Sequence, residues 1–245
     1  MGFRDESFIE LTARLRRRLT ALAEAEAEHV CVPIAGSGTF AVEAMLGTLV
    51  PRDSRALVLV NGAYGRRIAN ILIHAGRHCE VLTGAENQPL DSAAATARLD
   101  ADSSINDVVM VHCETTSGVL NPLQEIAEVV SQRGRRLLVD AMSSFGAIPI
   151  NAKQIAFDGL AASANKCLES VPGAAFVLVI DPSPRFYYQF QAVRHFVGRA
   201  LRQLAPEFLA ESIQFFRSRQ TKMCNPVVQL QFETAISHAV ILLRS

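Results

Sequence analysis

Short apolar runs alternate with stretches of helical periodicity up to about residue 180, and this alternation constrains the fold more than any other feature. Strands that alternate with helices predict βαβ units and a mainly parallel sheet covered by helices on both faces, which is an α/β fold. Ligands of such sheets bind at the carboxyl ends of the strands, where loops lead into helices. The expected strands are VCVPI (30–34), ALVLVN (56–61), DVVMVHC (107–113), RLLVDA (136–141), DGLAASA (158–164) and GAAFVLVI (173–180).

Two further segments carry the apolar spacing of helices. Residues 7–28 predict a long helix, and its arginines (Arg14, Arg16, Arg17 and Arg18) are expected to form a solvated face. Residues 151–156 predict a short helix before the DGLAASA strand. A βαβ unit built this way would bring the carboxyl ends of the RLLVDA and DGLAASA strands to one edge of the sheet.

Composition excludes several classes of protein. The 245 residues are 49% hydrophobic, which suits one large domain, or one domain and part of a second. The 24 basic and 24 acidic side chains balance, so neither nucleic acid nor an anionic membrane surface is expected as a partner. No apolar run approaches the ~20 residues of a membrane span, and the segment MGFRDESF is charged, so a cytoplasmic location is expected. The five cysteines are scattered and form no CxxC pair, which argues against a disulfide framework and against zinc.

The segment AGSGT follows the first strand and opens a helical stretch. Gly36 and Gly38 would let the backbone approach an anion, while Ser37, Thr39 and the first N–H groups of the helix could donate to phosphate oxygens. The same residues also suit an ordinary helix start with Ser37 or Thr39 as the N-cap. The segment matches neither a Walker loop nor GxGxxG, which argues against a nucleotide.

Two charged residues fall at the ends of expected strands. Asp140 ends a strand of Leu and Val, where it either caps the following turn or meets a buried cation such as a protonated pyridine nitrogen. Lys166 follows the DGLAASA strand, where it is either a snorkelling lysine or a largely desolvated amine that forms a Schiff base. A phosphate-binding turn, a strand-end aspartate and a lysine, in this order, favour pyridoxal phosphate as the cofactor.

A metal site at HCE is not expected. His112, Cys113 and Glu114 are consecutive, and consecutive strand residues point to alternating faces, so they cannot share one ion. We interpret His112 as a satisfied strand histidine.

Longer segments resemble the class V aminotransferases of fold type I. The resemblance runs from about residue 4 to residue 180 and, within that family, is greatest to the branch that moves an amino group from 2-aminoethylphosphonate to pyruvate. It is carried by VPIAGSGTFAVEAMLGTLVPRD, NGAYGRR, VHCETTSGVLNPL, LLVDAMSSFGAIPI and SANKCLESVPG.

The resemblance implies roles for individual residues. Lys166 would form the Schiff base with pyridoxal phosphate and move the proton, and Asp140 would keep the pyridinium nitrogen protonated. Tyr64 would stack on the cofactor ring, although it also suits an ordinary aromatic residue at a helix start. The remaining implied cofactor contacts are Ser37, Gly38, Thr39, Thr115, Met142 and Asn165.

The resemblance also implies an amine donor and pyruvate as substrates, phosphonoacetaldehyde and alanine as products, and a homodimer whose active sites are shared across a two-fold axis. It predicts a cofactor-binding large domain at 1–180 and a divergent, helical segment at 181–245. The family's N-terminal Thr-Pro-Gly-Pro motif and its complete small domain have no counterpart. Arg185, Arg194 and Arg199 are candidates for the substrate-carboxylate arginine only by residue type.

Three alternatives to this function remain open. A truncated relative would bind the cofactor and turn nothing over. An alanine-glyoxylate type of class V aminotransferase would share the fold. A cysteine desulfurase is disfavoured because desulfurases usually place histidine directly before the lysine, where this chain has Asn165.

Overall fold

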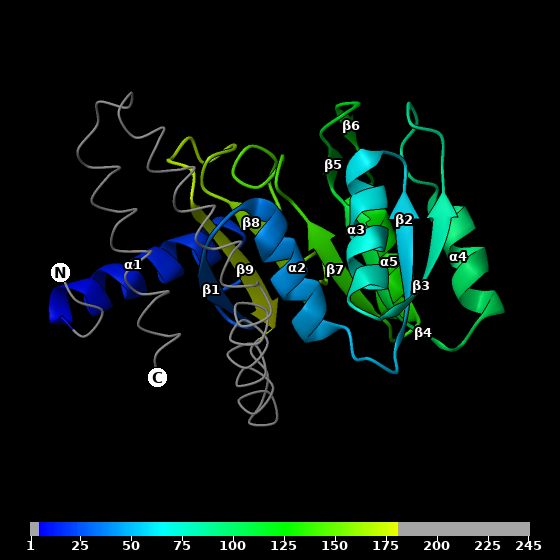
Figure 1. Cartoon of the computed structure of the whole chain (residues 1–245), viewed down its shortest axis with the longest axis horizontal. Coiled ribbons are helices and arrows are strands. Elements are labelled where there is room, and N and C mark those ends of the chain that lie inside the picture. Colours follow the sequence, from blue (N-terminus) through cyan, green and yellow to red (C-terminus); the bar gives the residue numbers. More distant parts are fainter. Residues whose placement is uncertain (1–4, 181–245) are drawn as a thin grey trace, which may run out of the picture. The chain divides into compact units, whose positions relative to one another are not determined.

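A seven-stranded, mainly parallel sheet organises residues 5–180, which are the part of the chain that the computed structural model describes (Figure 1). Its strand order is β1-β9-β8-β7-β4-β2-β3, and only β9 runs against the others. The expected mainly parallel α/β sheet is therefore confirmed. The strands are β1 (His29–Ala35), β2 (Arg55–Val60), β3 (His78–Thr83), β4 (Ile105–Val111), β7 (Arg136–Asp140), β8 (Gly159–Ser163) and β9 (Ala174–Ile180), and a separate hairpin pairs β5 (Cys113–Glu114) with β6 (Val119–Leu120).

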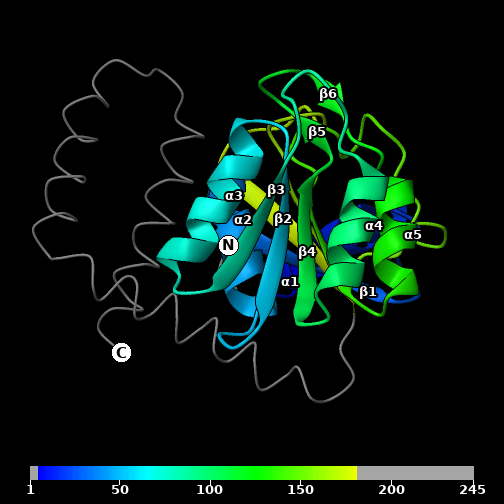
Figure 2. The same ribbon diagram turned by 90° about the vertical axis from the view of Figure 1, so that its right-hand side faces the viewer.

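Helices cover both faces of this sheet, as Figure 2 shows for the pair α2 and α3 on one side and the pair α4 and α5 on the other. The cause lies in the strands, whose residues are buried on both faces, as in the continuous buried run of β8. Close packing is visible at Gly159, where a Cβ atom would lie 2.6 Å from Cδ1 of Leu49 in α2. The helices are α1 (Glu6–Leu22), α2 (Gly38–Leu49), α3 (Ala63–His74), α4 (Ser92–Ala101) and α5 (Leu123–Gln132).

The helix expected at 7–28 ends at Leu22, so its last turn and a half were predicted wrongly. Glu24 adopts a left-handed backbone with φ of 48°, and the N–H of Ala25 donates to the carbonyl of Thr20 at 3.0 Å. This is the geometry of a helix C-cap, which glycine usually signals in a sequence and which glutamate does not. The arginine run on α1 is exposed, as expected.

The helix expected at 151–156 is also wrong, because these residues form turns. The side chain of Asn151 accepts from the N–H of Lys153 at 2.9 Å, and its carbonyl accepts from Ile155 at 2.8 Å. A side chain that bonds its own backbone competes with helix formation, and six residues are too few to offset the cost of nucleation. The parallel pairing of β7 and β8 nevertheless forms as expected.

Strand β3 was not predicted. It lies at the edge of the sheet, and its residues are partly or fully exposed, so the apolar run that signals a buried strand is lacking. None of the helices between residues 5 and 180 combines the length and apolar character that a membrane crossing requires.

Candidate active site

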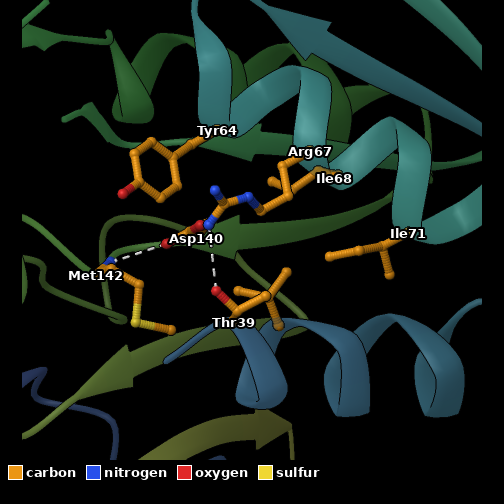
Figure 3. Close-up of a pocket in the computed structure, with 8 residues that line it drawn as sticks. Thr39, Tyr64, Arg67, Ile68, Ile71, Asp140 and Met142 are labelled. Carbon is orange, nitrogen blue, oxygen red and sulfur yellow. Dashed lines mark hydrogen bonds between the residues drawn. The ribbon is translucent and has the colours of Figure 1, made fainter. Parts of the chain in front are cut away.

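A pocket opens where the carboxyl ends of the parallel strands meet the helices α2 and α3 (Figure 3). Strand β1 leads into α2, strand β2 leads into α3, and strand β7 ends at Asp140. Four of the predicted site residues, Thr39, Tyr64, Asp140 and Met142, line the pocket. The other lining residues are Val42, Arg67, Ile68 and Ile71.

The amino end of α2 forms one wall of the pocket. The hydroxyl of Ser37 accepts a hydrogen bond from the N–H of Phe40 at 3.2 Å, so Ser37, and not Thr39, is the N-cap. Gly38 allows a close approach there, because a Cβ atom would lie 2.6 Å from the sulfur of Met142 and that side chain would have to shift. The N–H groups of a first helical turn lack intrahelical acceptors and favour anions. The helix-cap interpretation therefore holds for Ser37, and it leaves room for an anion at Gly38 and Thr39.

Asp140 is a buried carboxylate at the centre of the site, with 4% of its surface exposed. One oxygen accepts from the N–H of Met142 at 3.0 Å, which is the turn cap that the sequence left open. Burial raises the pKa of Asp140 to about 6 and the charge of Glu114 adds to this, while the Met142 N–H, Arg67 and Lys166 oppose it. A carboxylate that is costly to ionise suits a cationic, proton-bearing partner, as a protonated pyridine nitrogen would be.

Tyr64 is held by a carboxylate that the sequence did not single out. Glu114, fully buried at the end of β5, accepts from the backbone N–H of Tyr64 at 3.2 Å and of Gly65 at 3.3 Å. Gly62 permits this approach, because a Cβ atom there would lie 2.2 Å from Cγ of Glu114. A negative charge at a helix amino end is stabilising. Glu114 thus fixes the first turn of α3, from which Tyr64 reaches the pocket.

Arg67 is the second site residue that the sequence reasoning missed. It lies one turn after Tyr64 on α3, and its guanidinium carbon is 4.9 Å from the centroid of the Tyr64 ring. Its Nη1 donates to the hydroxyl of Thr39 at 3.4 Å (Figure 3). The three-residue spacing in YGRR was the available signal, because residues i and i+3 share one face of a helix.

Lys166 lies outside the pocket, in the connection between β8 and β9. Its side chain is exposed, and so is that of Asn165. The expectation of a largely desolvated lysine is therefore wrong in the part of the chain that the structure describes, where Lys166 is exposed to solvent. The lysine follows the last buried residue of β8, Ser163, and its turn is closed by a hydrogen bond from the N–H of Glu169 to the carbonyl of Lys166 at 2.9 Å. Asp140 ends β7 and Lys166 follows β8, and because these two strands are parallel, both residues lie toward the same end of the strands.

Thr115 also lies beside the pocket and not in its lining. Its hydroxyl shares a hydrogen bond of 2.6 Å with that of Ser143, which joins the β5–β6 hairpin to the turn after Asp140. Together with the hydrogen bond from the Tyr64 N–H to Glu114, this contact connects the ends of β2, β5 and β7.

His112 is buried but not satisfied, which corrects the sequence interpretation. It follows β4 and does not lie within it, and its Nδ1 has no hydrogen-bond partner among residues 5–180. Burial lowers the pKa of His112 to about 4, so the ring is neutral near pH 7. No cluster of three metal-ligating side chains occurs in the described part of the chain.

The parallel sheet with a carboxylate at the end of β7 has the architecture of the large domain of fold type I transferases. The sequence model of the family described as aminotransferase class V matches residues 4–180, well over half of the chain. The chain therefore belongs to the class V aminotransferase family, whose members are pyridoxal-phosphate-dependent enzymes.

Among curated proteins, the 2-aminoethylphosphonate–pyruvate transaminase of Pseudomonas fluorescens is 53% identical over 182 residues, which are 74% of this chain and 49% of that protein. The enzyme of the same name from Pseudomonas aeruginosa is 53% identical over 72% of this chain and 47% of its own length. This chain thus spans about half the length of these relatives.

Solved structures agree on the fold. The pyridoxamine–pyruvate aminotransferase of Mesorhizobium loti matches with a TM-score of 0.70 and 26% identity, over 78% of this chain and 48% of that protein. The alanine–glyoxylate aminotransferase of Nostoc matches with a TM-score of 0.70 and 24% identity, over 78% of this chain and 49% of that protein.

Proposed function

We propose that the pocket of Asp140 binds pyridoxal phosphate and that the chain is a transaminase that moves the amino group of 2-aminoethylphosphonate to pyruvate. The observation that carries the proposal is Asp140 itself. It is a nearly fully buried carboxylate with a raised pKa and one hydrogen bond within residues 5–180, at the end of the strands where this fold binds ligands. A cationic ring nitrogen would offset the cost of its ionisation.

Each wall of the pocket suits one part of this cofactor. The carboxylate of Asp140 would hold the ring nitrogen in its protonated form. The Tyr64 ring and the Met142 side chain would cover the ring and exclude water from it. The amino end of α2 at Gly38 and Thr39 would bind the phosphate. Thr115 and Asn165, which are not among the lining residues, would contribute contacts at the rim of the pocket.

Pyridoxal phosphate supplies an aldehyde that condenses with amines and a cationic ring that withdraws electrons from the neighbouring carbon. In our proposal the Nζ amine of Lys166 would hold the cofactor by its aldehyde, and the same amine would carry the proton to and from the substrate carbon. Proton transfer by a positioned side chain contributes roughly 10²- to 10⁴-fold to rate. Asp140 sustains this chemistry by keeping the ring nitrogen charged.

The substrates are proposed from the relatives that share 53% identity with this chain and carry 2-aminoethylphosphonate and pyruvate in their names. The donor would leave as phosphonoacetaldehyde and pyruvate as alanine, which places the enzyme in phosphonate catabolism. We propose the cytoplasm as its location.

A homodimer is the proposed assembly. Its support in the structure is α1, on which five large apolar side chains are exposed: Phe8, Ile9, Leu11, Leu15 and Leu22. Sedimentation velocity of the full chain tests this assembly, and a monomer at every concentration would contradict it.

One titration tests the cofactor proposal. The full chain is mixed with pyridoxal phosphate, and we expect a visible absorption band together with borohydride labelling of the peptide that contains Lys166. Absence of both the band and the label would overturn the proposal. Addition of 2-aminoethylphosphonate is then expected to bleach the band, with alanine formed after pyruvate is added.

A cofactor-binding remnant without turnover is the second candidate. One observation favours it: the side chain of Lys166 is exposed. Under this alternative the band forms and 2-aminoethylphosphonate leaves it unchanged. The same titration therefore separates the two candidates.

A further inference from the structure

Arg67 lies among the residues proposed to bind the cofactor, yet the role of its charge is not explained by the fold. Its guanidinium stacks over Tyr64 at 4.9 Å and donates to Thr39 at 3.4 Å. The Tyr64 contact lies within α3, and the Thr39 contact joins α3 to the amino end of α2, so the cation lies at the wall where an anion would bind. No carboxylate within residues 5–180 forms an ion pair with Arg67.

The neighbouring arginine shows what a structural role looks like on the same helix. Arg66 is also exposed, and its Nη1 is 2.8 Å from a carboxylate oxygen of Glu86 in an ordinary surface ion pair. Arg67 instead points its charge into the pocket (Figure 3). Arg67 lines the pocket together with Asp140, whereas Lys166 does not.

The guanidinium lies over the Tyr64 ring, and its Nη1 donates to the hydroxyl of Thr39. A planar guanidinium held in this way is suited to oxygens of phosphate or phosphonate, which it can bind with two parallel N–H groups. The first N–H groups of α2 point at the same region, so the helix dipole and the guanidinium favour the same anion.

We propose that Arg67 is an anion-binding residue of the site, which holds a phosphate or phosphonate oxygen together with Thr39 and the amino end of α2. The inference rests on the proposed function, because it assigns Arg67 either to the phosphate of the cofactor or to the phosphonate of the substrate. Both groups are tetrahedral oxyanions on a carbon-bearing ligand, and binding measurements separate them.

The experiment compares pyridoxal phosphate with pyridoxal, which has the same ring and no phosphate. Dissociation constants are measured by visible absorbance for the full chain and for its Arg67→Gln, Arg67→Lys and Arg66→Gln variants. If Arg67 binds the cofactor phosphate, Arg67→Gln raises the dissociation constant of pyridoxal phosphate about tenfold or more and leaves that of pyridoxal unchanged. Arg67→Lys, which keeps the charge and loses the planar fork, falls between the two.

If Arg67 binds the substrate phosphonate, Arg67→Gln leaves both cofactor affinities unchanged. The concentration of 2-aminoethylphosphonate that half-bleaches the band then rises about tenfold, while that of propylamine, which lacks the phosphonate, does not change. Either result supports the inference and assigns the anion.

The control variant Arg66→Gln is expected to match the unmodified chain in every titration, and circular dichroism checks that each variant folds. If Arg67→Gln lowers the affinities for pyridoxal phosphate and for pyridoxal equally, Arg67 has a packing role and the inference is overturned. The inference is also overturned if Arg67→Gln changes none of the titrations. Failure of the proposed function looks different, because the unmodified chain would then bind neither compound, and the inference would fall with it.

Discussion

The sheet buries one aspartate near the amino ends of its parallel strands and another at their carboxyl ends, and the polar partners of the two carboxylates differ. Asp107, near the start of β4, has no exposed surface and accepts a hydrogen bond from the hydroxyl of Ser54 at 2.5 Å. Its other oxygen lies 2.5 Å from Nη2 of Arg136, its direct partner on β7. Asp140, at the far end of β7, has one backbone N–H.

This difference separates structural burial from functional burial. Asp107 has a cation on the neighbouring strand and a hydroxyl from Ser54, just before β2, and both oppose burial, which still raises the pKa of its carboxyl. Asp140 lacks such a contact among the described residues, and its pKa is raised to about 6. A carboxylate left under-compensated beside a pocket is typical of a site that awaits a cationic ligand. We therefore expect substitutions near Asp140 to affect function and substitutions near Asp107 to affect stability.

The largest effect is expected for Lys166→Ala. The amine is lost and borohydride no longer fixes the cofactor on this peptide, while turnover of 2-aminoethylphosphonate falls by more than about 100-fold. The lysine is exposed, so the free energy of unfolding is expected to stay unchanged. Mass spectrometry of the reduced complex and urea unfolding measure the two quantities. A variant that kept full turnover would place the reacting amine elsewhere.

Asp140→Asn is expected to lower the affinity for the cofactor and to stabilise the cofactor-free chain. The folded pKa of about 6 lies above the ordinary 3.8, so ionised Asp140 lowers stability at pH 7 and this cost disappears below about pH 4. Removing the charge adds up to roughly 3 kcal/mol to the free energy of unfolding at pH 7. Urea unfolding at pH 4 and pH 7 tests the sign, and a loss of stability at pH 7 would contradict the compensation argument.

Asp107→Asn is the matched change at the opposite edge. The ion pair with Arg136 is lost and leaves that cation unpaired. This loss is expected to outweigh the relieved cost of burying the Asp107 charge, so the free energy of unfolding falls by about 1 to 3 kcal/mol. Affinity for pyridoxal phosphate is expected to remain, because Asp107 lies at the other end of the strands. Urea unfolding and the cofactor titration measure both. A large loss of cofactor affinity in a folded Asp107→Asn variant would contradict the view that the amino ends of the strands serve stability and not cofactor binding.

Ser37→Ala is expected to have the smallest effect. It removes the hydrogen bond to the N–H of Phe40 and lowers the free energy of unfolding by about 1 kcal/mol, whereas Ser37→Gly costs only a few tenths. Thermal unfolding of the two variants measures the difference. If both bind pyridoxal phosphate as well as the unmodified chain does, the hydroxyl serves the helix and not the phosphate.

Much of the fold was readable because buried strands of a parallel sheet are apolar on both faces. All six expected strands occur, although the strand expected through Cys113 stops at Val111 before a separate hairpin begins. The edge strand β3 carried no such signal. The errors at 23–28 and 151–156 share one cause, since in both a backbone turn overrides the apolar spacing.

The candidate site divides in the same way. Asp140, Gly38, Thr39 and Tyr64 could be found because each follows the end of an expected strand, and strand ends of one direction meet at one edge. Arg67 and Glu114 could not be found by that rule, since they act on Tyr64 from within a helix and from a hairpin. The roles of the individual site residues remain predictions that the variants above can test.

Apart from the edge strand β3 and the turns at 151–156, the sequence by itself determined the order of strands and helices, because apolar periodicity records how many faces of an element are buried. Tertiary structure alone decided that β9 runs against its neighbours, that Lys166 lies exposed, and that Asp107 gains a cation while Asp140 gains a single N–H. The reason is physical: pairing direction and the partners of a buried charge depend on contacts between residues far apart in the chain, which no local pattern encodes.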